Sequence, residues 1–107
     1  MKYNVFFLSD AEEDLYEIFN YKAKNDSVIK ADKLLNNIEE VCKSLSNLPN
    51  KGHIPPELEC ISILDYKEIH HLPYRIIYQI INNNVYIHCI LDGRRDIQEI
   101  LLHRLLR

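Results

Sequence analysis

The sequence predicts an α+β fold in which an N-terminal strand and a helical hairpin pack on an antiparallel sheet of about four strands, followed by a short C-terminal helix. Two segments within residues 10–48 show helical spacing of apolar residues, and β-branched and aromatic residues dominate residues 61–91. The length of 107 residues suits one hydrophobic core, so we expect residues 1–107 to form a single domain. The content of 47% hydrophobic and 27% charged residues is typical of globular proteins.

The N-terminal half is predicted to form a strand and two helices. Residues 3–8 (YNVFFL) are largely aromatic and β-branched, which predicts the strand. Ser9 and Glu12 match a capping box, in which the two side chains bond free backbone amides, and predict a helix over about residues 10–24. The second helix begins near Ser27, and the short connection before it predicts an antiparallel helical hairpin. Its apolar stripe has a helical period and comprises Ala31, Leu34, Leu35, Ile38, Val41, Cys42, Leu45 and Leu48.

The C-terminal half is predicted to form the rest of the sheet. One strand lies within residues 61–72, one at residues 74–81 and one at residues 85–91. The three asparagines at positions 82–84 predict a tight turn, because asparagine tolerates positive φ. Residues 96–107 predict a short final helix.

The strand at residues 74–81 is apolar on both faces. One face carries Tyr74, Ile76, Tyr78 and Ile80, and the other carries Arg75, Ile77, Gln79 and Ile81. A sheet with one face in water would alternate cleanly between apolar and polar residues. Because the helical hairpin can cover only one face, the other is either packed by the C-terminal segment or left open as a binding cleft.

Charge is distributed unevenly along the chain. The formal net charge is −3, yet all arginines and histidines lie in residues 51–107. Arginine is the preferred residue for bidentate recognition of phosphate or carboxylate, so an anion-binding site is expected in this half. The acidic balance argues against a protein that works mainly through nucleic-acid phosphates.

The three cysteines and the lack of long apolar segments indicate a cytoplasmic protein. Cys42, Cys60 and Cys89 are odd in number and lie in apolar surroundings, so we expect reduced core thiols. The N-terminus has no signal-peptide pattern, and no apolar run reaches the roughly 18 residues that a membrane span needs.

Four motifs, in this order, give the chain a family resemblance. They are KGHIPPEL at residues 51–58, YKEI at 66–69, PYRIIY at 73–78 and DGRRD at 92–96. Together with the predicted order of elements, they resemble the RelE/ParE toxins of bacterial type II toxin–antitoxin systems over essentially the whole chain. The resemblance implies a growth inhibitor, known also from plasmid stabilisation, that is neutralised by a cognate antitoxin. It implies no cofactor.

The resemblance implies two possible activities. RelE-like members are ribosome-dependent endoribonucleases that cleave mRNA without metal, and Arg75 matches a residue that stabilises the reacting phosphate in that branch. Alternatively, Arg75 forms an ion pair with a glutamate such as Glu68 on a neighbouring strand. ParE-like members inhibit DNA gyrase and are not established enzymes. A third hypothesis is an inactive, toxin-like binding module.

The C-terminal part of the chain offers few candidates for the general acid or base that a RelE-like ribonuclease would use. No tyrosine follows Tyr86, and His103 is expected on the surface of the final helix. His53, beside Gly52, is a weaker candidate for a proton carrier, and a turn-capping role is the alternative. The other histidines show no metal-ligand spacing, so the sequence predicts no metal site.

We therefore favour the ParE-like activity, and two sets of residues are predicted to make contacts. Arg94 and Arg95, in the most charged segment of the C-terminal third, are expected to bind the target together with Gln79. In the same turn, Gly93 is expected to supply a positive φ and Asp96 to cap the final helix.

The final helix has more leucine than one buried face requires. Leu102 and Leu106 widen its apolar stripe, so the helix is expected to be covered by its own sheet, by a second copy of the chain or by an antitoxin segment. The family resemblance favours the antitoxin. By resemblance, a toxin–antitoxin assembly would bind operator DNA through the antitoxin.

Overall fold

A four-stranded sheet in the order β1–β4–β3–β2 forms the centre of the computed structural model, which describes residues 2–106. The predicted α+β class, the four strands and the helical hairpin are confirmed, and a short helix, α3, lies in the segment before β2. The elements are β1 (Asn4–Phe7), α1 (Ser9–Asn25), α2 (Val28–Lys43), a 3₁₀ turn η1 (Ser44–Ser46), α3 (Pro56–Glu59), β2 (Lys67–His71), β3 (Tyr74–Ile81), β4 (Asn84–Asp92) and α4 (Ile97–Leu105). Of the predicted final helix, Arg107 lies outside the described residues.

The sheet is mixed, which differs from the antiparallel pairing that the sequence predicts. β3 pairs antiparallel with both β2 and β4, but β1 pairs parallel with β4, with Val5 opposite Val85. Parallel neighbours need a long crossover connection. The helical hairpin and the β2–β3 pair provide it, because the chain after α2 returns to the start of β1, where the Tyr3 amide donates to the Ser46 carbonyl over 2.8 Å.

The two long helices begin differently. The predicted capping box at Ser9 is wrong, because Leu8 is the N-cap of α1 and no side chain caps this end. Instead, the Glu12 amide donates to the Leu8 carbonyl as in an ordinary first helical turn. Ser27 does cap α2, since its hydroxyl accepts from the Lys30 amide at 3.1 Å. The predicted stripe ends before Leu48, whose side chain is 60% exposed beyond η1.

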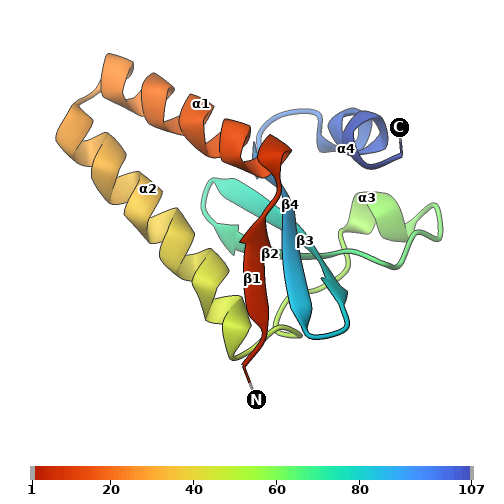
Figure 1. Ribbon diagram of the computed structural model, residues 1–107. Helices are drawn as coiled ribbons and strands as arrows, with labels where there is room; N and C mark the ends of the chain where they lie inside the picture. Colours follow the sequence, from red (N-terminus) through yellow and green to blue (C-terminus); the bar gives the residue numbers. More distant parts are fainter. Residues whose placement is uncertain (1, 107) are drawn as a thin grey trace.

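The helical hairpin covers one face of the sheet and makes the larger core (Figure 1). Ile38 of α2 and Leu45 of η1 are fully buried there against β3 and β4. The buried members of this cluster are Ala11, Leu15, Ile38, Cys42, Leu45, Ile69, Ile76, Tyr78, Val85, Ile87 and Ile90.

The opposite face is packed by α3 and α4, so it is not an open cleft (Figure 1). Ile77 of β3 lies at 0% exposure in a second cluster with Leu58 of α3 and Leu101 of α4. The other buried members are Cys89, Leu91 and Ile97. Of the two alternatives for the second face of β3, packing by the C-terminal segment is therefore confirmed.

A β-bulge lets β4 serve both cores. Opposite Ile77 and Tyr78 of β3 lie Cys89 and Ile87, so His88 is the extra residue. A one-residue shift exchanges the two faces of a strand. Consequently Ile87 and Ile90 face the helical hairpin, whereas Cys89 faces α3 and α4. The turn that follows β3 is tight, as predicted, with Asn82 at a φ of 57°.

The cysteines divide between core and surface. Cys42 and Cys89 are buried thiols outside any disulfide, and burial raises the pKa of Cys42 to about 12. Cys60 is exposed, so the prediction of a core thiol is wrong there: it lies at the end of α3, a helix of one turn with its buried side at Leu58. Among residues 2–106, no helix is long and apolar enough to cross a membrane.

Candidate functional site

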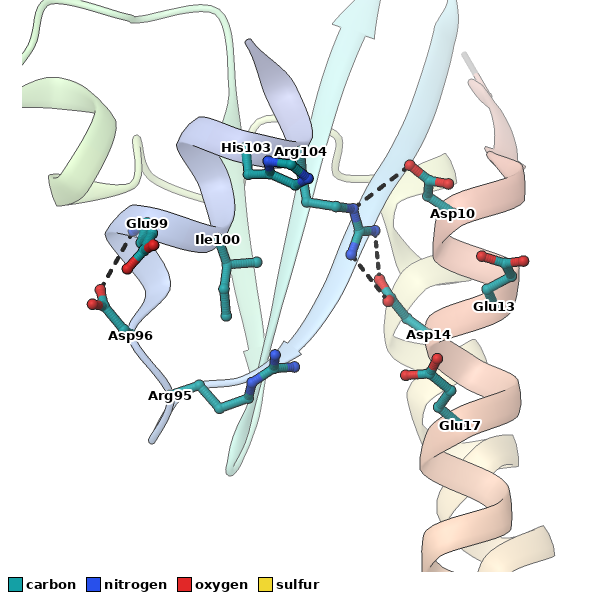
Figure 2. A pocket seen from close by; sticks show the side chains of 10 residues that line it. All are labelled: Asp10, Glu13, Asp14, Glu17, Arg95, Asp96, Glu99, Ile100, His103 and Arg104. Carbon is teal, nitrogen blue, oxygen red and sulfur yellow. Dashed lines mark hydrogen bonds and ion pairs between the residues drawn. The ribbon is translucent and has the colours of Figure 1, made fainter. Parts of the chain in front are cut away.

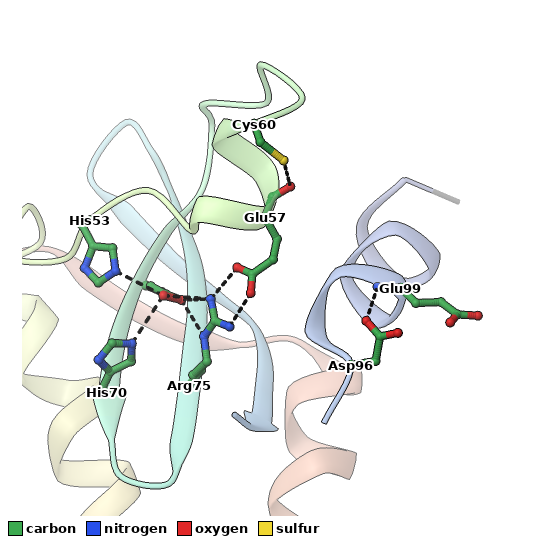
Figure 3. A network of polar contacts seen from close by, with 8 residues as sticks. His53, Glu57, Cys60, His70, Arg75, Asp96 and Glu99 are labelled. Atoms are coloured by element: carbon green, nitrogen blue, oxygen red, sulfur yellow. Dashed lines mark hydrogen bonds and ion pairs between the residues drawn. The ribbon is translucent and has the colours of Figure 1, made fainter. Parts of the chain in front are cut away.

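Arg75 lies at the centre of a polar network on the α3 side of the sheet (Figure 3). Its Nη1 and Nη2 atoms donate to the two carboxylate oxygens of Glu57 in α3, each over 2.7 Å. Its Nε atom donates to Glu68 Oε2 in β2 over 2.9 Å, and Nη2 lies 2.6 Å from the same oxygen. Both glutamates therefore bind the guanidinium in a bidentate arrangement.

The three charged side chains of this network are largely buried. The side chains of Arg75 and Glu57 are 15% and 23% exposed, and that of Glu68 is 2% exposed. The hydrogen bonds from Arg75 hold the pKa of Glu57 below its usual range, and those to Glu57 and Glu68 raise the pKa of Arg75. Of the alternatives for Arg75, the ion pair with Glu68 is the one observed, and Glu57 adds a second carboxylate.

His53 and His70 lie together on the other side of Glu68 (Figure 3). Their Nε2 atoms are 3.1 Å and 3.3 Å from the same Glu68 Oε1 atom, and their rings meet edge to face with centroids 5.5 Å apart. The side chains are 59% and 42% exposed. His53 thus forms part of the Arg75 network, whereas the sequence suggests for it only a proton carrier or a turn cap.

Hydrogen bonds to β2 and to Tyr78 hold the loop that carries His53 in place. The His53 amide donates to the Glu68 carbonyl and the Glu68 amide to the His53 carbonyl, which joins the loop to the outer edge of β2. Tyr78 donates to the Pro49 carbonyl over 2.7 Å and accepts from the Gly52 amide, and burial raises the pKa of Tyr78. A Cβ at Gly52 would lie 2.6 Å from both the Glu68 carbonyl oxygen and the Tyr78 hydroxyl, so only glycine fits.

The turn between β4 and α4 carries Arg94 and Arg95 on the surface. Arg94 is 76% exposed and forms an ion pair of 2.6 Å with Asp92, which lowers the pKa of Asp92 to about 2. Asp96 caps α4 as predicted, accepting from the Glu99 amide. No glycine has a positive φ, so the prediction for Gly93 is wrong. Close approach explains this glycine instead, because a Cβ would lie 3.0 Å from the Pro73 carbonyl oxygen.

A groove of about 660 Å³ separates this turn and α4 from α1 (Figure 2). Arg104 of α4 closes one end, donating to Asp14 over 2.9 Å and lying 3.6 Å from Asp10. Asp14 also accepts from the Ile90 amide of β4, beyond the end of the β1 pairing. The residues lining the groove are Asp10, Glu13, Asp14, Glu17, Arg95, Asp96, Glu99, Ile100, His103 and Arg104.

Gln79 lies away from the two exposed arginines. It shares a face of β3 with Arg75, four residues farther along the strand, which corresponds to about 13 Å. His88 Nε2 lies 3.2 Å from its side-chain oxygen, and the His88 ring meets Tyr66 edge to face. The predicted grouping of Gln79 with Arg94 and Arg95 therefore spans two separate regions of the surface.

The leucines of α4 divide into inner and outer residues. Leu101 is fully buried on the sheet, and Leu105 packs against the same cluster. Leu102 and the C-cap residue Leu106 lie outside this cluster and are 38% and 50% exposed. The excess leucine noticed in the sequence therefore forms an exposed apolar edge of α4.

Comparison with known proteins places this architecture in a family. Residues 5–97 match the family model of the ParE toxin of the type II toxin–antitoxin system parDE. The chain belongs to the RelE/ParE toxin family. The family resemblance based on four motifs is thereby confirmed. No protein with a curated description matches the sequence.

Two solved structures are similar in fold to this chain. A structure of the chromosomal ParDE system from P. aeruginosa matches with a TM-score of 0.69 and 19% identity, over 83% of this chain and 94% of that chain. The toxin–antitoxin complex RelBE2 from Mycobacterium tuberculosis matches with a TM-score of 0.62 and 19% identity, over 84% and 96%. Both branches of the family therefore share the fold of this toxin.

Proposed function

We propose that this toxin arrests growth by inhibiting DNA gyrase through protein–protein contact, and that a cognate antitoxin neutralises it in the cytoplasm. The observation that carries the proposal is that the guanidinium of Arg75 is already paired with carboxylates. Two buried or half-buried glutamates bind its guanidinium, so it is not free to meet a phosphate. A ribonuclease needs a preorganised cation at the position where phosphorane charge develops.

The exposed arginines support a protein target. Arg94 and Arg95 lie in the turn between β4 and α4, and both are exposed. Exposed arginines are enriched among the residues that dominate protein interfaces, because one side chain combines charge, planarity and five donors. The acidic net charge of −3 also suits a protein partner better than bare nucleic acid.

A supercoiling assay with purified gyrase tests this proposal. Combined replacement Arg94→Ala and Arg95→Ala is expected to weaken inhibition about tenfold or more, which corresponds to about 1.4 kcal/mol of interface energy. The matched control is Lys24→Ala with Lys33→Ala, which removes the same charge from exposed positions on the helical hairpin. Inhibition that is equal in the parent and the Arg94/Arg95 variant would refute the proposed contact.

The RelE-like ribonuclease is the second candidate, supported by the pair His53 and His70 beside Arg75. Two imidazoles and a guanidinium are groups that metal-free RNA cleavage can use. Cleavage of ribosome-bound mRNA, without an effect on gyrase, would establish this activity. Activity in neither assay would indicate a binding module that only engages the antitoxin and, through it, operator DNA.

The exposed edge of α4 is proposed to bind the antitoxin. Leu102→Gln with Leu106→Gln is expected to weaken antitoxin binding about tenfold or more while the melting temperature falls much less, because both side chains are partly exposed and lie outside the buried cluster under α4. Isothermal titration calorimetry measures the affinity. Leu72→Gln, at an 84% exposed position in the β2–β3 turn, is the control. Equal affinity of the double variant and the parent would exclude this edge.

A further inference from the structure

We propose that His53, Glu68 and His70 form a binding site for a divalent transition-metal ion such as Zn²⁺. One ligand atom from each residue lies within 4.8 Å of the other two. The three residues come from the loop before α3 and from the edge strand β2. This proposal is independent of the gyrase target, and it revises the sequence-based expectation that no metal site is present.

The spacing of the ligand atoms suits a tetrahedral ion. The two imidazole Nε2 atoms lie 3.1 Å and 3.3 Å from Glu68 Oε1. In a tetrahedral zinc site with bonds of about 2.0–2.1 Å, neighbouring ligand atoms are about 3.3 Å apart. Both nitrogen–oxygen distances are therefore close to those of a metal site. The two imidazole nitrogens lie within 4.8 Å of each other, and rotation of the partly exposed side chains can shorten this distance.

The ligands are held by a second layer of contacts. Arg75 binds both oxygens of Glu68, which fixes the plane of the carboxylate. Paired backbone hydrogen bonds between His53 and Glu68 fix the loop against the strand, and the Gly52–Tyr78 contact anchors it from the other side. Such outer contacts orient the ligands of natural metal sites. This site therefore needs no backbone rearrangement to bind an ion.

Charge and accessibility also favour a cation. Glu57 and Glu68 carry two negative charges against the one positive charge of Arg75, so the network has a net charge of −1 when both imidazoles are neutral. The imidazole rings are 59% and 42% exposed, so an ion and a water ligand can reach them from solvent. Two imidazoles and one carboxylate suit zinc and similar transition metals better than magnesium or calcium.

The experiment is a calorimetric titration of the full-length toxin with ZnCl₂, in a Cys60→Ser background because the exposed Cys60 thiol can itself bind zinc. We expect one equivalent to bind. His53→Ala and His70→Ala are each expected to weaken binding about tenfold or more, since even the loss of an outer contact costs about 10–100-fold in metal affinity. His103→Ala, which removes an exposed histidine on α4, is the matched control.

Co²⁺ provides a second readout. A tetrahedral site of this kind gives visible absorption bands, and these are expected in the parent and in His103→Ala but not in the His53 or His70 variants. Circular dichroism checks that each variant is folded. Zinc binding that is absent in the parent, or that is equal in the parent and both histidine variants, would overturn the proposal and indicate adventitious binding only.

Discussion

Replacing Arg75 with alanine is expected to lower the free energy of unfolding by about 3 kcal/mol. Removal of the guanidinium leaves Glu57 and the 2% exposed Glu68 close together without a counter-charge. Breaking a buried ion pair at one partner costs about 3–5 kcal/mol. The lower end applies because Glu68 keeps its contacts with His53 and His70 and Glu57 can turn toward water.

Urea unfolding monitored by circular dichroism measures this loss. The matched control is Arg94→Ala, whose exposed ion pair with Asp92 is expected to contribute nothing measurable. The triple replacement of Arg75 by methionine and of Glu57 and Glu68 by glutamine removes all three charges together. It is expected to recover most of the stability, because neutral side chains of similar volume avoid the cost of burying charge. Arg75→Ala unfolding at the urea concentration of the parent would show that the network is not structural.

This result also decides how the toxicity of Arg75 variants is interpreted. In a ribonuclease, Arg75→Ala would abolish toxicity beyond the loss of folded protein, since the arginine would also act on the transition state. In the proposed gyrase inhibitor, toxicity would fall only as far as the folded population falls. Measuring growth inhibition and unfolding on the same variants separates these two causes.

Local patterns in the sequence were sufficient to predict most of the fold. β3 has the predicted bounds, and α2 follows its apolar stripe closely, because burial on one face leaves a periodic pattern in the sequence. The parallel pairing of β1 and the bulge at His88 were not predictable in this way. The β1–β4 pairing joins segments about 80 residues apart, and the bulge depends on the register between β3 and β4, so neither follows from the local pattern alone.

The candidate site was predicted only in part. Arg75 stood out as an isolated charge on an apolar strand, and Glu68 was a foreseeable partner on the adjacent strand. Glu57 was missed because α3 is one turn long and gives no periodic signal. His53 and His70 come together through a loop whose path depends on Gly52 and Tyr78, and Arg104 meets Asp14 across nearly the whole chain. Side-chain pairs of this kind require the tertiary structure.

The replacement Ile38→Ala is expected to cost about 2–5 kcal/mol, a large share of the roughly 5–15 kcal/mol that stabilises a small domain. Ile38 has no exposed surface and lies in the middle of α2, within the cluster between the helical hairpin and the sheet. Truncation to alanine removes buried methyl groups and leaves a cavity that a helix packed along its length cannot close. Thermal unfolding would show this as a clear fall in melting temperature. Ile29→Ala is the matched control, since Ile29 is 82% exposed near the start of the same helix and alanine has the higher helix propensity. If both variants melted like the parent, α2 would not be the element that packs the helical hairpin against the sheet.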